Sequence, residues 1–229
     1  MQLFFRMFRK MQKHAIIVAG GKGLRMNSEV PKQFVVLAGK PVLMHTIEAF
    51  ARCDAAINIV LVLPGTQIPL WHDLCRKHAF VRQCAIAEGG ETRFHSVSNG
   101  LALIDGEGLV AVHDGVRPLV SGATIARCFA AAAECQAVVP VVDCVDSLRQ
   151  IAGTETIAVD RAAFKLVQTP QVFDVQLLKN AYRQAYSPAF TDDASVVESS
   201  GAKIRLVEGN RENIKITAPI DLKIANILI

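Results

Sequence analysis

The sequence lacks paired cysteines and long apolar runs, and both absences exclude classes of protein. Its six cysteines form no Cys-x-x-Cys pair, and none has a histidine partner at the spacing of a zinc site. No apolar run reaches the ~18 residues of a membrane span, and the start of the chain shows no long apolar core with a cleavage site, as a secretory signal would. We therefore expect a cytoplasmic protein without a membrane role, whose cysteines are small, reduced and buried.

A strong excess of one charge is also missing. The 229 residues include 25 lysines and arginines against 21 aspartates and glutamates, which gives a net charge of +4. No basic run with interleaved aromatic residues is present, so we expect no nucleic-acid partner. The mild positive charge instead suits the binding of small anions.

Internal repeats and low-complexity linkers are absent as well. The length and the 51% content of hydrophobic residues suffice for one sizeable α/β domain, but not for two. We expect this domain at residues 14–229, after an N-terminal extension at residues 1–13 that holds much of the positive excess. Met11 is a candidate start within that extension.

The strongest indication of function lies in residues 14–32, which read HAIIVAGGKGLRMNSEVPK. An apolar run of the kind found in buried parallel strands comes first, and three glycines within four residues follow it. Such glycines let the backbone approach a ligand, and successive N–H groups can form an anion site. Together with the cations Arg25 and Lys32, this pattern predicts a triphosphate site. The glycines are Gly20, Gly21 and Gly23.

Other glycine loops fit this stretch less well. A Walker A string is absent, and the dinucleotide fingerprint lacks its third glycine because Met26 occupies that place. This disfavours a Rossmann dehydrogenase. An ordinary strand-to-helix turn with solvated Arg25 and Lys32 remains an alternative for the stretch taken alone.

Strand and helix patterns alternate along the rest of the chain. This alternation predicts an α/β fold with a Rossmann-like, mostly parallel sheet flanked by helices. Trp71 is expected in the core. Further strands are predicted at residues 58–63, 82–87, 109–113, 137–142 and 203–208. Helices are predicted at residues 42–52, 68–78 and 121–134, and another is predicted to end at residue 104. A further helix is predicted to begin at 192 or 193, with Asp192 or Asp193 as its N-cap, and the last helix to begin at 219.

Two further stretches place polar groups at the ends of predicted strands. Gly89 and Gly90 open a helix that has Ser96 in its first turns, which predicts free N–H groups beside a ligand, although an ordinary capped helix explains it too. Asp114 ends the strand at 109–113, and the carboxyl ends of parallel strands form the ligand-binding edge. Its carboxylate suits Mg²⁺; the alternative is a turn former before Gly115. We expect His113 to serve packing.

Residues 143–161 alternate polar and apolar side chains around a break at Gly153. This pattern predicts a β-hairpin that is polar on one face. A projecting hairpin cannot bury both faces alone. We therefore predict an arm at about residues 142–162 that needs a partner.

Five strings resemble the nucleotidyltransferases that make NDP-sugars and CDP-alcohols, and within them the 2-C-methyl-D-erythritol 4-phosphate cytidylyltransferase (IspD) family. Its loop usually reads Ala-Ala-Gly-x-Gly-x-Arg-Met-x4-Pro-Lys-Gln, so Gly20 in place of the second alanine is a small departure. The other strings are Gly-Gly-x-x-Arg-x-x-Ser-Val from 89, Asp-Gly-x-Arg-Pro from 114, Gln-Thr-Pro-Gln-Val-Phe from 168 with Asp160-Arg161 before it, and Asn-Ile-Lys-Ile-Thr from 213.

The resemblance implies a nucleotide-diphospho-sugar transferase type of fold and the transfer of a cytidylyl group from CTP to 2-C-methyl-D-erythritol 4-phosphate. It also implies Mg²⁺ or another divalent cation, and a homodimer whose arms help complete the partner's site. The implied catalytic residues are Arg25, Lys32, Arg161 and Lys215. The implied nucleotide-binding residues are Ala19, Gly20, Gly21, Gly23, Gly90, Ser96 and Asp114. The implied substrate-binding residues are Asp114, Arg117, Ser147, Arg161 and Thr169, with Asp114 as the metal ligand.

Two alternatives to this function remain open. One is a cytidylyltransferase for another polyol phosphate, such as ribitol 5-phosphate, because the glycine loop does not distinguish the acceptors. The other is a non-catalytic nucleotide-binding module, which the presence of Arg25, Lys32, Asp114 and Lys215 together disfavours. The choice of cytosine follows from the resemblance alone.

Overall fold

The computed structural model describes residues 11–20 and 30–229, and a mixed, mostly parallel eight-stranded sheet forms its centre. The strand order is β10-β7-β11-β6-β1-β4-β5, and β12 pairs with β7. Pairs along β6-β1-β4-β5 are parallel, whereas β11 runs antiparallel between β6 and β7. The strands are β1 (Lys13–Val18), β4 (Asn58–Leu63), β5 (Ala85–Glu88), β6 (Leu109–Asp114), β7 (Ala137–Asp143), β10 (Lys165–Val167), β11 (Gln171–Asp174) and β12 (Arg205–Glu208).

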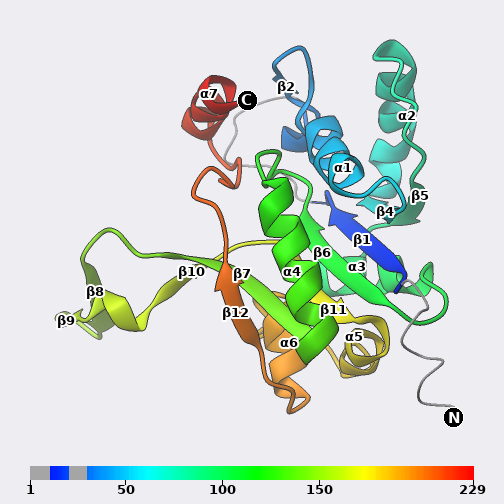
Figure 1. Cartoon of the computed structure of the whole chain (residues 1–229). Helices are drawn as coiled ribbons and strands as arrows, with labels where there is room; N and C mark the ends of the chain where they lie inside the picture. The colour runs from blue at the N-terminus through cyan, green and yellow to red at the C-terminus, as the bar shows by residue number, and fades with distance from the viewer. Residues whose placement is uncertain (1–10, 21–29) are drawn as a thin grey trace, which may run out of the picture.

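Helices cover both faces of the sheet (Figure 1). Ala15 and Ile17 of β1 face one helical layer, and Ile16 between them faces the other, as the two-residue period of a strand requires. The first layer holds α1 (Val42–Cys53), α2 (Ile68–Lys77) and α4 (Gly122–Cys135); the second holds α3 (Arg93–Ala102), α5 (Val175–Ala181) and α6 (Asp193–Ser199). None of the helices in the described residues combines the length and apolar composition that crossing a membrane requires.

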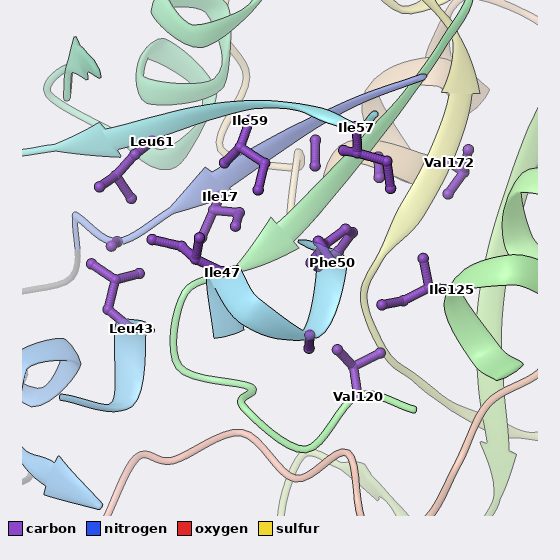
Figure 2. Packing of buried hydrophobic residues seen from close by; sticks show 14 of the residues in the cluster. Ile17, Leu43, Ile47, Phe50, Ile57, Ile59, Leu61, Val120, Ile125 and Val172 are labelled. Carbon is purple, nitrogen blue, oxygen red and sulfur yellow. The ribbon is translucent and has the colours of Figure 1, made fainter. Parts of the chain in front are cut away.

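The larger core lies between the sheet and α1. Figure 2 shows Ile47 and Phe50 of α1 beside Ile17 of β1, and all three side chains are fully buried. Burial of each such side chain contributes roughly 1.5–3 kcal/mol, so this layer holds the strand ends in place. Trp71 is buried against Phe34 and Phe80, which confirms its predicted core position.

A smaller apolar cluster closes the end of the domain. The last helix, α7 (Pro219–Leu228), packs its Ala225 near Leu37 of the hairpin formed by β2 (Val36–Leu37) and β3 (Lys40–Pro41). Ile216 belongs to the same cluster and is fully buried. This packing anchors the segment that carries Lys215.

Most predicted elements are confirmed, although some bounds differ and some short elements are missing from the prediction. The strand predicted at 203–208 begins at Arg205. The strand predicted at 82–87 begins at Ala85, because the Arg82 guanidinium donates to the Ala55 and Ile57 carbonyls and holds the chain outside the strand. The elements β10, β11 and α5 were not predicted, since each has only three to seven residues. All six cysteines are free, but only Cys128 is buried and the other five are half-buried, so the expectation of buried cysteines is wrong for those five.

The predicted hairpin is present and projects from the body of the domain (Figure 1). It consists of β8 (Leu148–Ala152) and β9 (Glu155–Val159), joined at Gly153, whose φ of 64° favours glycine. Ile151 is 71% exposed and Ile157 55% exposed on this arm. Apolar surface of this kind is typical of a contact with a partner.

Candidate active site

The predicted nucleotide-binding turns meet at the carboxyl edge of the sheet. Ala19 and Gly20 follow β1, and Gly89 and Gly90 follow β5. Ser96 of α3 connects the two turns, because its hydroxyl accepts from the Gly90 amide at 3.1 Å and would lie 3.9 Å from a Cβ added at Gly20. That 3.9 Å is ordinary contact, so the family's alanine would also fit at Gly20.

Ser96 holds the second turn in shape. Its hydroxyl donates to the Thr92 carbonyl at 2.9 Å while it accepts from Gly90, and its side chain is buried. Thr92 caps α3 by accepting from the His95 amide. The helix start and the Gly89–Gly90 turn are therefore one hydrogen-bonded unit beside the end of β1.

Asp114, the last residue of β6, is the centre of a cluster of charges. Lys215 Nζ and Arg117 Nε each lie 3.1 Å from Asp114 Oδ2, and Arg93 Nε lies 3.9 Å from Oδ1. Burial by itself would raise the pKa of Asp114, but the three basic side chains, led by Lys215, outweigh it and hold the pKa well below its usual range. The carboxylate is therefore ionised at neutral pH.

A chain of hydrogen bonds supports Asp114 from behind. The Asp114 amide donates to Thr169 Oγ1 at 3.1 Å, and this hydroxyl lies 3.0 Å from His113 Nδ1. A carbonyl oxygen can only accept, so His113 Nε2 donates to the Arg117 carbonyl at 3.1 Å, and Nδ1 of the neutral ring accepts from the Thr169 hydroxyl. Burial lowers the pKa of His113 to about 4, so the ring stays neutral at pH 7, as this series of hydrogen bonds requires. His113 is thus buried, as expected, and also orients the site.

The predicted C-terminal string joins the same cluster through Asn213. Arg117 donates to the backbone carbonyl of Asn213 at 2.7 Å. The side-chain Nδ2 of Asn213 donates to the backbone carbonyl of Thr169 at 2.8 Å. The Asn213 side chain is fully buried, and its Oδ1 has no hydrogen-bond partner among the described residues. Three segments that are distant from Asp114 in sequence, at residues 93, 169 and 213–215, therefore converge on it, and this brings the predicted site residues Arg117, Thr169 and Lys215 together.

Lys32 begins the short helix η3 (Lys32–Phe34), which returns the chain to the end of β1. The side-chain Nε2 of the neighbouring Gln33 donates to the Ala19 carbonyl at 2.7 Å and to Gln67 Oε1 at 2.6 Å. This anchor ties the segment that carries Lys32 to the first residue after β1. The predicted residues Gly21, Gly23 and Arg25 lie outside the described residues.

The structure places Ser147 and Arg161 on the projecting arm, where both are exposed, and not in the Asp114 cluster of the same chain. Arg161 lies in η5 (Arg161–Ala163) and donates to the Val145 carbonyl within the arm.

Sequence reasoning missed two charged residues beside the site. Arg93 belongs to the string Gly-Gly-x-x-Arg-x-x-Ser-Val but is not among the predicted site residues, and the sequence predicts Asp193 only as a possible helix cap. Asp192 is the N-cap of α6, through a capping box with Ser195, whereas Asp193 turns inward and bonds Arg93. The sequence does not distinguish an inward-facing Asp193 from a helix cap, because either of two adjacent aspartates at a helix start can be the N-cap.

The donor set fits a Mg²⁺ ion that is held partly by phosphate. Among residues 11–20 and 30–229 there is no group of three or more histidine, cysteine, aspartate or glutamate side chains that could bind a metal. Mg²⁺ is usually bound by one or two carboxylates together with substrate phosphates and water. Asp114 supplies one carboxylate, and the unpaired Asn213 Oδ1 is a second hard oxygen in the same cluster.

Comparison with known proteins decides the family. The family model described as 2-C-methyl-D-erythritol 4-phosphate cytidylyltransferase, IspD, matches residues 13–229. The chain belongs to this family. IspD proteins of that name from Phocaeicola vulgatus and Bacteroides fragilis are 60% and 58% identical over 219 residues, which cover 96% of this chain and 100% of each relative.

Solved IspD structures share the fold. The 4-diphosphocytidyl-2C-methyl-D-erythritol synthase from Anaerococcus prevotii has a TM-score of 0.81 at 28% identity, covering 95% of this chain and 96% of that one. The 2-C-methyl-D-erythritol 4-phosphate cytidylyltransferase from Thermus thermophilus has a TM-score of 0.75 at 32% identity, covering 95% and 98%. IspD membership confirms the predicted nucleotidyltransferase class, and the likeness to these solved structures confirms the predicted fold.

Proposed function

We propose that the chain transfers the cytidylyl group of CTP to 2-C-methyl-D-erythritol 4-phosphate, which gives 4-diphosphocytidyl-2-C-methyl-D-erythritol and diphosphate. The observation that supports it best is the convergence of Lys215, Arg117 and Arg93 on Asp114 beside two glycine turns. The IspD relatives that carry this name match the chain over nearly its whole length.

The reaction needs little proton transfer, because the nucleophile is a phosphate. Its second pKa is near 6, so most of it is dianionic at neutral pH. The barrier lies in bringing two polyanions together, and fixed positive groups aimed at the α-phosphate lower that barrier. We assign this role to Lys32 and Arg25, with Lys215 directed at the metal-bound phosphates.

Asp114 would hold the divalent cation, and the buried Asn213 Oδ1, which has no hydrogen-bond partner among the described residues, would be a second oxygen ligand. A bound Mg²⁺ would neutralise part of the triphosphate charge. In the ligand-free protein, Lys215 and Arg117 balance Asp114. Lys215, whose side chain is 42% exposed, would turn toward phosphate oxygens when anionic substrates enter.

We further propose a homodimer in which the arm of each chain completes the partner's site with Arg161 and Ser147. The exposed apolar side chains of the arm support this, because a two-stranded hairpin is only marginally stable alone. Light scattering at micromolar concentration tests the assembly, and a monomeric mass would contradict it. The proposal includes a cytoplasmic location, which the six free thiols support.

A diphosphate-release assay with CTP, Mg²⁺ and each acceptor tests the function. We expect release with 2-C-methyl-D-erythritol 4-phosphate and much slower release with ribitol 5-phosphate. Faster release with ribitol 5-phosphate would assign another acceptor. CTP binding by calorimetry without release for any acceptor would indicate a binding module.

A further inference from the structure

A second carboxylate lies behind the Asp114 cluster and reaches it through Arg93. Asp193 is fully buried at the start of α6, and its two oxygens accept from the two terminal nitrogens of Arg93 at 2.8 and 2.6 Å. The Tyr182 hydroxyl donates a third hydrogen bond to Asp193 Oδ1, at 2.7 Å. Two parallel bonds fix the plane of a guanidinium as well as its position.

This restraint leaves the Nε edge of Arg93 facing the site. Arg93 Nε stays 3.9 Å from Asp114 Oδ1, which is beyond hydrogen-bond length. A guanidinium released by Asp193 would be attracted to Asp114 and could close that gap. It would then compete for Oδ1 with any ligand that approaches Asp114.

The surroundings of Asp193 favour a fixed geometry. Phe94 stacks on Tyr182 with ring centroids 4.7 Å apart, and Phe190 stacks on Phe94 at 5.7 Å. Burial raises the pKa of Tyr182, and the charge of Asp193 raises it further, so the hydroxyl remains a donor. A buried ion pair adds little net stability, so the position of Arg93 is the clearer consequence of this arrangement.

We propose that Asp193, assisted by Tyr182, is a positioning residue that holds the Arg93 guanidinium at a fixed distance from Asp114 and keeps one oxygen of Asp114 open to the incoming ligand. The inference rests on the proposed role of Asp114 in the transfer reaction. The adjacent Asp192 has another task, since it caps α6 and accepts from Gln171 at 2.7 Å.

The kinetic test compares Asp193→Asn with Asp192→Asn in the full chain. Both remove one negative charge at the same helix start, and asparagine at 192 still caps. We expect Asp193→Asn to lower kcat about tenfold or more with little change in the KM for CTP, and Asp192→Asn to stay within about twofold of the wild type. Asp193→Glu, which keeps the charge, should retain most of the rate. Equal losses in Asp193→Asn and Asp192→Asn would overturn the proposal.

A spectroscopic test reads the restraint without turnover. In NMR spectra of the ligand-free enzyme with ¹⁵N-labelled arginine, the Arg93 Nε–H resonance is assigned by its loss in Arg93→Lys. We expect Asp193→Asn to shift this resonance as Nε–H bonds Asp114, and Tyr182→Phe, which keeps the ring stack, to shift it less in the same direction. An unmoved resonance in folded Asp193→Asn, or in Tyr182→Phe if the former fails to fold, would overturn the proposal. A wild-type enzyme that shows this restraint but releases no diphosphate would instead contradict the proposed function.

Discussion

The Asp114 cluster and the arm differ in how their charged side chains are held. Near the sheet edge, Asp114 and Asp193 are buried, and each has at least two side-chain partners, one of them about a hundred positions away in sequence. On the arm, Arg161 is exposed and bonds only a neighbouring carbonyl among the described residues. The cluster is therefore organised within one chain, whereas the arm residues gain a precise position only against a partner.

The largest effect is expected from removing a cation of the cluster. Lys215→Ala should lower kcat by about 10²–10³, because a preorganised positive group lost from a phosphate site typically costs that much. Steady-state diphosphate release measures it, with Lys223→Ala as control, since Lys223 is an exposed lysine on α7. A change confined to KM would identify Lys215 as a ground-state binder instead.

Replacing the arm cation sharpens the comparison further. Arg161→Ala should lower kcat/KM by about 10²-fold without lowering the unfolding temperature, since its side chain is exposed. Co-expression of Arg161→Ala with Lys215→Ala chains should regain about a quarter of the wild-type activity, because half of the randomly assorted dimers are mixed and each has one intact site. If no activity returns, the arm serves its own chain and the shared site is wrong.

Stability should separate the two regions as well. Phe50→Ala, in the fully buried layer under His113, should reduce the free energy of unfolding by about 3–5 kcal/mol. Ile151→Ala on the arm, where the side chain is 71% exposed, should change it by less than about 0.5 kcal/mol in a monomer. Urea unfolding at low protein concentration provides both values. A comparable loss in the two variants would mean that the arm packs against its own domain.

A further expected effect is a dependence of stability on pH. The folded pKa of His113, about 4, lies below its ordinary value of 6.5. The unfolded chain therefore binds the proton first, so His113 contributes stability above pH 6.5 that is lost as the pH falls toward 4, by roughly 3 kcal/mol. Burial also lowers the pKa values of His14 and His45. These two residues therefore also contribute stability that is lost as the pH falls.

His113→Gln should flatten this dependence, while His72→Gln, on an exposed position, should leave it unchanged. Urea midpoints between pH 4 and 7 provide the measurement. An equally steep dependence in His113→Gln would show that other groups cause it.

The sequence predicted most strands and helices, because the patterns that indicate them are local. Apolar runs and glycine turns at 15–23, 89–90 and 114–115 identified the strand ends, and parallel topology brings such ends to one edge. The short strand β11 escaped prediction, since four residues carry too little periodicity. The inward turn of Asp193 escaped because two adjacent aspartates at a helix start look alike in sequence.

By itself, the sequence determined which residue types stand at the strand ends and, through five strings, the family to which the chain belongs. Only the tertiary structure decided which of them share a site, because ionic contacts between residues such as Asp114 and Lys215, or Arg93 and Asp193, join segments about a hundred positions apart. Their spacing in sequence carries no record of those distances. The fold sets them, by packing α3, α6 and the C-terminal segment around the end of β6.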